Sequence, residues 1–217
     1  MNIAFLGDSI TYGYALDDKS LKYSTLVASA LGMTEENYGI TGTLVAKAGL
    51  NNDNDNAFID RAHLIDNADV AVIFGGTNDY FWSDKPIEGD DTSYFARAVE
   101  EIIERVKEKR GEKLTLFVTP YPHNGIGNFE GADRWNTSSR HDTDAKNYNG
   151  HSLEDYSNKI VELCTKHGVE YLNLHRDFPF DHRVHTIDGC HPNPQGHAMI
   201  AKAIVDKIRL ISQGEPD

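Results

Sequence analysis

Short apolar runs alternate with helical patterns along this chain of 217 residues, and that alternation constrains the fold most. The runs with the length and composition of strands cover residues 2–6, 69–74, 113–118 and 169–174. Helical patterns cover residues 21–31, 93–109, 153–167 and the stretch from 194 onward. A strand, helix, strand order predicts a parallel sheet covered on both faces, with ligands bound beyond the carboxyl ends of the strands.

Two of the predicted helices have well-marked ends. Ser152 is a predicted N-cap with Asp155 three residues later, which is a variant of the capping box, and Gly168 follows the last helical residue. The final helix is predicted to begin with Asn193 as N-cap and Pro194 at its first position.

Length and composition predict one domain over residues 1–217 and exclude several partners. A hydrophobic fraction of 39% and a charged fraction of 25% are typical of a soluble globular protein. The formal net charge of −13 repels phosphate backbones and anionic lipids, so we expect neither nucleic acid nor a membrane as a partner. The apolar run at the N-terminus is too short for an export signal, and Cys164 and Cys190 lie in unrelated settings. We therefore expect a reduced, cytoplasmic protein, and the sequence leaves its oligomeric state open.

Two long loops, residues 80–91 and 119–150, are expected near the substrate site. How the second loop covers the site is left open by the sequence. Their aromatic residues either contact a substrate or anchor the loops in the core, and the sequence favours neither reading. These residues are Tyr80, Phe81, Trp82, Tyr121 and Trp135.

The strongest candidate nucleophile is Ser9, which follows the first predicted strand in the turn Gly7-Asp8-Ser9-Ile10. A serine hydroxyl needs a positioned base, and that base needs an orienting carboxylate. Asp188 and His191 supply both groups, since a three-residue spacing in a glycine-containing loop lets the carboxylate reach one imidazole nitrogen while the other faces Ser9. Asn78, after the second predicted strand, is well placed to donate a hydrogen bond to a developing oxyanion.

Four blocks of this sequence resemble the SGNH hydrolase family, also called GDSL esterases and lipases. They begin at Gly7 (GDSI), Asn37 (NYGITG), Gly76 (GTND) and Asp188 (DGCH), and Ile10 replaces the leucine of the family name. The resemblance implies a flavodoxin-like three-layer α/β/α sandwich with a parallel sheet of about five strands.

The same resemblance implies the roles of the site residues. Ser9 would be the nucleophile, His191 the base and Asp188 its partner. The amides of Ser9 and Gly42 and the side chain of Asn78 would form the oxyanion hole. Gly39 is the alternative to Gly42 in the second block, and spacing favours Gly42.

Several other patterns have simpler explanations. No paired ligands accompany the histidines His182, His185, His191 and His197, so we expect no metal and no cofactor. Residues 51–56 (NNDNDN) lack the later glycine and glutamate of a calcium loop and are expected to form a solvated loop. Cys190 is expected to pack near the site.

The predicted function is hydrolysis of a small carboxylic ester through an acyl-enzyme, with an acetylated carbohydrate or similar polar ester favoured by the acidic composition and the loop aromatics. The acyl and alcohol portions are not specified by the sequence. The alternatives are a lysophospholipase or thioesterase-type acylhydrolase, and a non-catalytic carbohydrate-binding module on the same scaffold. Phosphoryl transfer through Asp8 is disfavoured because the second aspartate of a D-x-D pattern is absent.

Overall fold

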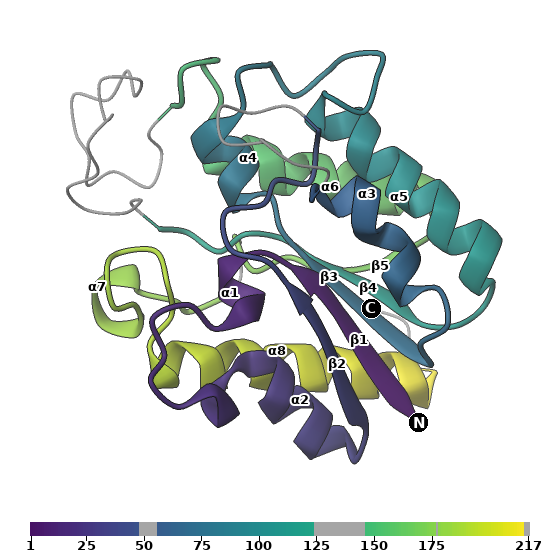
Figure 1. Cartoon of the computed structure of the whole chain (residues 1–217), viewed down its shortest axis with the longest axis vertical. Coiled ribbons are helices and arrows are strands. Elements are labelled where there is room, and N and C mark those ends of the chain that lie inside the picture. The colour runs from purple at the N-terminus through teal and green to yellow at the C-terminus, as the bar shows by residue number, and fades with distance from the viewer. Residues whose placement is uncertain (48–55, 124–145, 177, 215–217) are drawn as a thin grey trace.

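A parallel sheet of five strands organises the chain in this computed structural model, which describes residues 1–47, 56–123, 146–176 and 178–214. The strand order is β2-β1-β3-β4-β5 (Figure 1). This is the flavodoxin-like order, so the predicted α/β fold with a five-stranded parallel sheet is confirmed. The strands are β1 (Asn2–Gly7), β2 (Thr34–Gly39), β3 (Val70–Phe74), β4 (Thr115–Val118) and β5 (Glu170–Leu172).

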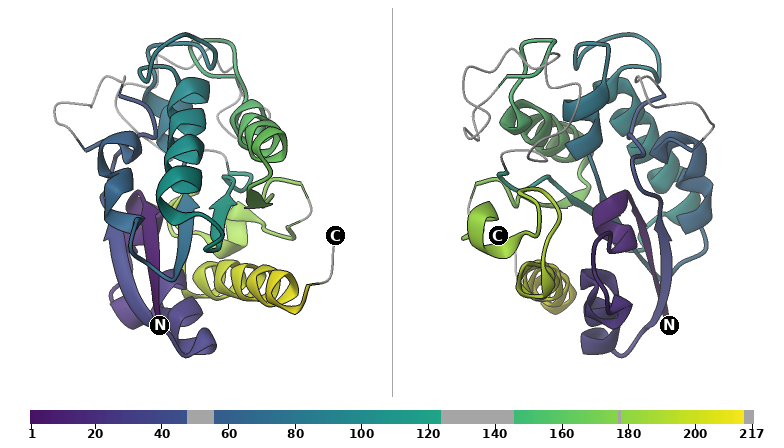
Figure 2. Two further views of the ribbon diagram at one scale, coloured as in Figure 1. Left: turned by 90° about the vertical axis from the view of Figure 1, so that its right-hand side faces the viewer. Right: turned by 60° about the vertical axis from the view of Figure 1, so that its left-hand side comes forward.

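Helices cover both faces of the sheet and complete the three layers (Figures 1 and 2). On one face lie α2 (Tyr23–Leu31) and α8 (Pro194–Gln213). On the other lie α3 (Phe58–Arg61), α5 (Phe95–Arg110) and α6 (Leu153–His167). Alternate residues of β1 explain the two cores, because Ile3 and Phe5 pack with α2 and α8, whereas Ala4 and Leu6 pack with α5 and α6.

The predicted helix ends are confirmed by their hydrogen bonds. The Ser152 hydroxyl accepts from the Asp155 amide (3.2 Å), and the Asp155 carboxylate accepts from the Ser152 amide (2.8 Å), which is a complete capping box. The Asn193 side chain accepts from the Gly196 amide (2.9 Å), with Pro194 as the first residue of α8.

Strand β2 and the short helices were not predicted from the apolar pattern. The sequence of β2, TEENYG, carries no alternation of apolar and polar residues, because the strand lies at the sheet edge and pairs only with β1. Helix α1 (Ser9–Tyr12) follows β1, and helix α4 (Thr77–Trp82) follows β3. Helix α7 (His182–His185) precedes Asp188. The expected loop at 80–91 therefore begins inside α4.

Within the described residues, no helix is both long and apolar enough to cross a membrane. Both cysteines carry free, buried thiols. Cys164 lies in α6, as its helical setting predicted.

Candidate active site

Ser9 is the first residue of α1, directly beyond the end of β1. Asp8 caps this short helix, and its carboxylate accepts a hydrogen bond from the Ile10 amide at 2.9 Å. Gly7 allows the close turn, since a Cβ atom there would lie 1.9 Å from the Thr11 hydroxyl oxygen. The amide of Ser9 stands at the start of a helix, where it has no acceptor within the helix.

Asp8 itself is turned into the protein. Asp8 is 2% exposed, and this burial raises the pKa of its carboxyl to about 6. The hydrogen bond from the Ile10 amide lowers the pKa but does not outweigh the burial. A carboxyl that caps a helix from the inside is poorly placed to attack a substrate, so the structure favours a positioning role for Asp8.

His191 connects Ser9 to Asp188. Its Nε2 atom lies 3.0 Å from the Ser9 hydroxyl, and its Nδ1 atom lies 2.6 Å from the Asp188 carboxylate. Both distances are those of hydrogen bonds. The structure thus brings together the three residues that the sequence singled out, although Ser9 and His191 are 182 residues apart along the chain.

The turn that carries Asp188 and His191 is organised by the same carboxylate. Its other oxygen accepts hydrogen bonds from the amides of Cys190 (3.0 Å) and His191 (2.7 Å). Partial burial opposes ionisation of Asp188, but the bonds from His191 and Cys190 outweigh it and lower its pKa to about 2. The carboxylate is therefore ionised at neutral pH and faces an imidazole that is only 5% exposed.

Asn78 lies in the first turn of α4, beyond the end of β3, and its side-chain amide donates to the Thr43 carbonyl at 3.0 Å. Thr43 directly follows Gly42, which adopts a positive φ of 78°. Gly39 is used differently, because its amide donates to the Asn37 side chain at 2.9 Å and its Cα lies against the backbone of Tyr12. This geometry favours Gly42 over Gly39 as the second-block donor.

Two residues whose importance the sequence did not indicate hold this loop in place. Asp79 accepts hydrogen bonds from the amides of Val45 (2.8 Å) and Ala46 (3.0 Å). Arg61 is 5% exposed and donates to the carbonyls of Gly7 (3.3 Å) and Tyr38 (2.5 Å) and to the Thr43 hydroxyl (3.0 Å). It therefore ties the ends of β1 and β2 to the loop that carries Gly42.

The sequence matches the GDSL-like lipase/acylhydrolase family model over residues 5–199. The chain belongs to this family. No curated protein matches it by sequence.

Solved structures share the fold of this GDSL-like protein over nearly its whole length. A protein from Lactobacillus plantarum is 26% identical with a TM-score of 0.77, and the match covers 97% of this chain and 96% of the other. A structure described as a possible lipase from Chitinophaga pinensis is 20% identical with a TM-score of 0.71, covering 97% and 98%. A carbohydrate acetylesterase from Sinorhizobium meliloti is 18% identical with a TM-score of 0.71, covering 97% and 99%.

The aromatic candidates of this GDSL-like protein separate into two groups. Tyr80 and Tyr121 are buried in the core, so they act as anchors. Phe81 is partly exposed and stacks on His123, with 5.3 Å between the ring centroids. Trp82 is also partly exposed, and Trp135 lies outside the described residues.

The remaining candidates do not assemble into a second centre. Within the described part of the chain, no three His, Cys, Asp or Glu side chains are grouped as metal ligands, and most of the 51–56 segment lies outside that part. His185 and His197 each accept a backbone hydrogen bond, from Asp181 (2.9 Å) and Tyr23 (3.1 Å). The Cys190 side chain is buried, as expected for a residue that packs near the site. Burial raises the pKa of its thiol.

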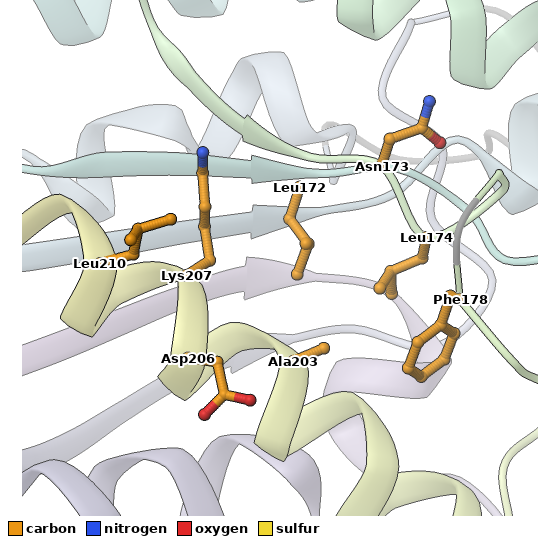
Figure 3. Close-up of a pocket in the computed structure, with 8 residues that line it drawn as sticks. All are labelled: Leu172, Asn173, Leu174, Phe178, Ala203, Asp206, Lys207 and Leu210. Carbon is orange, nitrogen blue, oxygen red and sulfur yellow. The ribbon is translucent and has the colours of Figure 1, made fainter. Parts of the chain in front are cut away.

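A pocket of about 420 Å³ opens between the end of β5 and α8 (Figure 3). Its walls are mainly apolar, and the side chain of Leu172 points from β5 toward α8. None of Ser9, Asp188 and His191 lines it. The lining residues are Leu172, Asn173, Leu174, Phe178, Ala203, Asp206, Lys207 and Leu210.

Proposed function

We propose that this GDSL-like protein is a serine esterase that hydrolyses a small carboxylic ester through an acyl-enzyme. The observation that carries the proposal is the continuous chain of hydrogen bonds from Ser9 through His191 to Asp188. It is the arrangement that activates a serine hydroxyl in unrelated hydrolases.

In the first half of the reaction, the Ser9 oxygen bonds to the carbonyl carbon while its proton passes to Nε2 of His191. The carbonyl oxygen becomes an oxyanion, which the amides of Ser9 and Gly42 and the side chain of Asn78 bind. The bond from carbon to the alcohol oxygen then breaks, and His191 gives its proton to the departing alcohol.

In the second half, water attacks the acyl group on Ser9 while His191 takes a proton from that water. Collapse of the second oxyanion breaks the bond to Ser9, and His191 returns the proton to the serine oxygen. The acid is released and the enzyme is restored without a cofactor.

We further propose a polar ester, such as an acetylated carbohydrate, as the substrate of a cytoplasmic enzyme. The net charge of −13 disfavours contact with an anionic lipid surface. The carbohydrate acetylesterase from Sinorhizobium meliloti shows that one protein with this fold acts on such esters. The burial of Tyr80 and Tyr121 removes part of the aromatic support for carbohydrate contact.

A fluorophosphonate probe tests the nucleophile. We expect it to label the wild type at Ser9 and to leave Ser9→Ala unlabelled, with ester hydrolysis lowered by about 10⁶-fold in the variant. Magnesium-dependent phosphatase activity without labelling would overturn the proposal, and an unreactive Ser9 in a protein that binds acetylated sugars would favour the binding module.

The acyl portion is tested with 4-nitrophenyl acetate, butyrate and octanoate, followed by acetylated sugars. We expect kcat/KM to be highest for acetate. A kcat/KM that rises with acyl length would replace the polar-ester proposal with a lysophospholipase or thioesterase-type activity.

A further inference from the structure

Tyr14 lies over the imidazole of His191 and has no part in the proposed steps. The two ring centroids are 4.6 Å apart and the rings are tilted by 47°. The amide of Tyr14 donates to the carbonyl of Ser9 at 2.8 Å. The same short turn therefore connects the nucleophile to the aromatic ring that covers the base.

The turn that presents Tyr14 is conformationally unusual. Ala15 has a φ of 63°, and among the described residues it alone adopts a positive φ without being glycine. Such a conformation costs free energy and persists only where surrounding contacts impose it. Here the flanking contacts are the Leu16 side chain, which is 6% exposed, and the bond from its amide to the Gly13 carbonyl (3.2 Å).

Tyr14 nevertheless keeps 45% of its surface exposed, whereas His191 keeps 5%. One part of the ring covers the imidazole and the remainder meets solvent beside it. Because Nε2 of His191 must protonate the departing alcohol, the alcohol portion of the ester lies next to this imidazole during acylation. Tyr14, whose ring centroid lies 4.6 Å from that of the imidazole, is therefore close to that position.

We propose that Tyr14 is a specificity-determining residue that stacks against the alcohol portion of the ester and selects a ring-shaped alcohol. A sugar ring or a phenol ring offers the flat apolar face that stacks on an aromatic side chain, and a short linear alcohol does not. This inference rests on the proposed esterase function. It adds that the enzyme selects its substrate by the alcohol portion of the ester.

The timing of the reaction separates this role from simple support of His191. The alcohol leaves before water attacks, so all acetate esters share one acetyl-enzyme. Stacking of Tyr14 on the alcohol therefore affects acylation alone, whereas a defect in holding His191 slows acylation and deacylation for every ester.

The test compares wild type, Tyr14→Phe and Tyr14→Leu on phenyl acetate, a mono-acetylated methyl pyranoside and ethyl acetate. We expect Tyr14→Leu to lower kcat/KM by about tenfold for the two ring alcohols and less than about twofold for ethyl acetate. The deacetylation rate constant from single-turnover measurements should change less than about twofold, and Tyr14→Phe should behave as wild type.

Tyr12→Leu is the matched control. Tyr12 is 50% exposed and lies two residues before Tyr14 in the chain. The Lys19 ammonium lies 4.9 Å from the centroid of its ring. We expect this variant to keep the kcat/KM of wild type for all three esters, including the preference for ring alcohols. An equal loss on all three esters for Tyr14→Leu, or no loss on any, would overturn the inference while leaving the esterase proposal intact. A wild type that takes no fluorophosphonate label and hydrolyses none of the esters would overturn both.

Discussion

Asp188 keeps its charge because three hydrogen bonds reach its two oxygens, from the His191 ring and from the amides of Cys190 and His191. An ionised carboxylate can only accept, so the bond between it and the ring requires the proton on Nδ1 of His191, which leaves Nε2 to accept from the Ser9 hydroxyl. In the proposed reaction, the ionised carboxylate would also stabilise the imidazolium that forms in each half.

At the residue scale, Asp188→Asn is expected to lower kcat by about 10⁴-fold, since an amide no longer favours the required tautomer. The pKa of Asp188, lowered to about 2, keeps the wild-type carboxylate charged above about pH 3, so the loss should be similar from pH 6 to 9. Steady-state kinetics at several pH values measure it.

A cooperative thermal transition by circular dichroism, with a midpoint well above the assay temperature, is the control for Asp188→Asn, because the lowered pKa of Asp188 means that loss of the charge also costs some stability. A loss smaller than about tenfold would show that His191 does not depend on Asp188.

The residues that the structure brings together at Ser9 were predictable because each has a chemical signature at the end of a predicted element. Arg61 and Tyr14 had none. Arg61 acts through carbonyls of β1 and β2, and an arginine that binds carbonyls looks like any surface arginine in a sequence. The position of Tyr14 depends on the turn through Ala15, and an alanine in a sequence gives no indication of a positive φ.

At the element scale, Asp79 couples α4 to the loop that follows Gly42. Burial raises the pKa of its carboxyl to about 7, although the bonds from Val45 and Ala46 oppose the shift. A raised pKa in the folded state means a contribution to stability that is complete below the unfolded value of 3.8 and is lost as pH rises toward 7.

We therefore expect the thermal midpoint of wild type to exceed that of Asp79→Asn, because asparagine can satisfy only one of the two amides. We expect the gap between the two midpoints to narrow from pH 4.5 to 7.5. Melting curves of both proteins across this range measure the gap. Titrations common to the two proteins cancel in the difference. A gap that widens with pH would show that the folded protein prefers the ionised carboxylate.

The predicted helices and strands were accurate where burial of one or both faces produces a regular apolar pattern in the sequence. The buried strands β1, β3 and β4 and the amphipathic helices α5 and α6 were found within two residues of their ends. Strand β2 was missed, since one of its edges has no partner strand and its residues are only partly buried. The short helices were missed because four to six residues contain too few turns for a period to appear.

At the scale of the whole molecule, a net charge of −13 should make the protein select against anionic esters. We expect kcat/KM for 4-acetoxybenzoate to rise by roughly two- to tenfold between 10 and 200 mM sodium chloride, because salt screens the repulsion. The uncharged phenyl acetate, measured alongside, should change little. A kcat/KM for the anionic ester that falls with salt would indicate a local cationic site instead.

The charged side chains at the edges of the sheet also affect how two molecules of this protein can meet. Strand β2 offers one unpaired edge of the described sheet, and it carries Glu35 and Glu36, while Glu170 stands on β5 at the opposite edge. An incoming strand from another molecule would have to pair its backbone alongside these charges. The polar residues that left β2 without apolar alternation are therefore expected to oppose edge-to-edge pairing in concentrated protein.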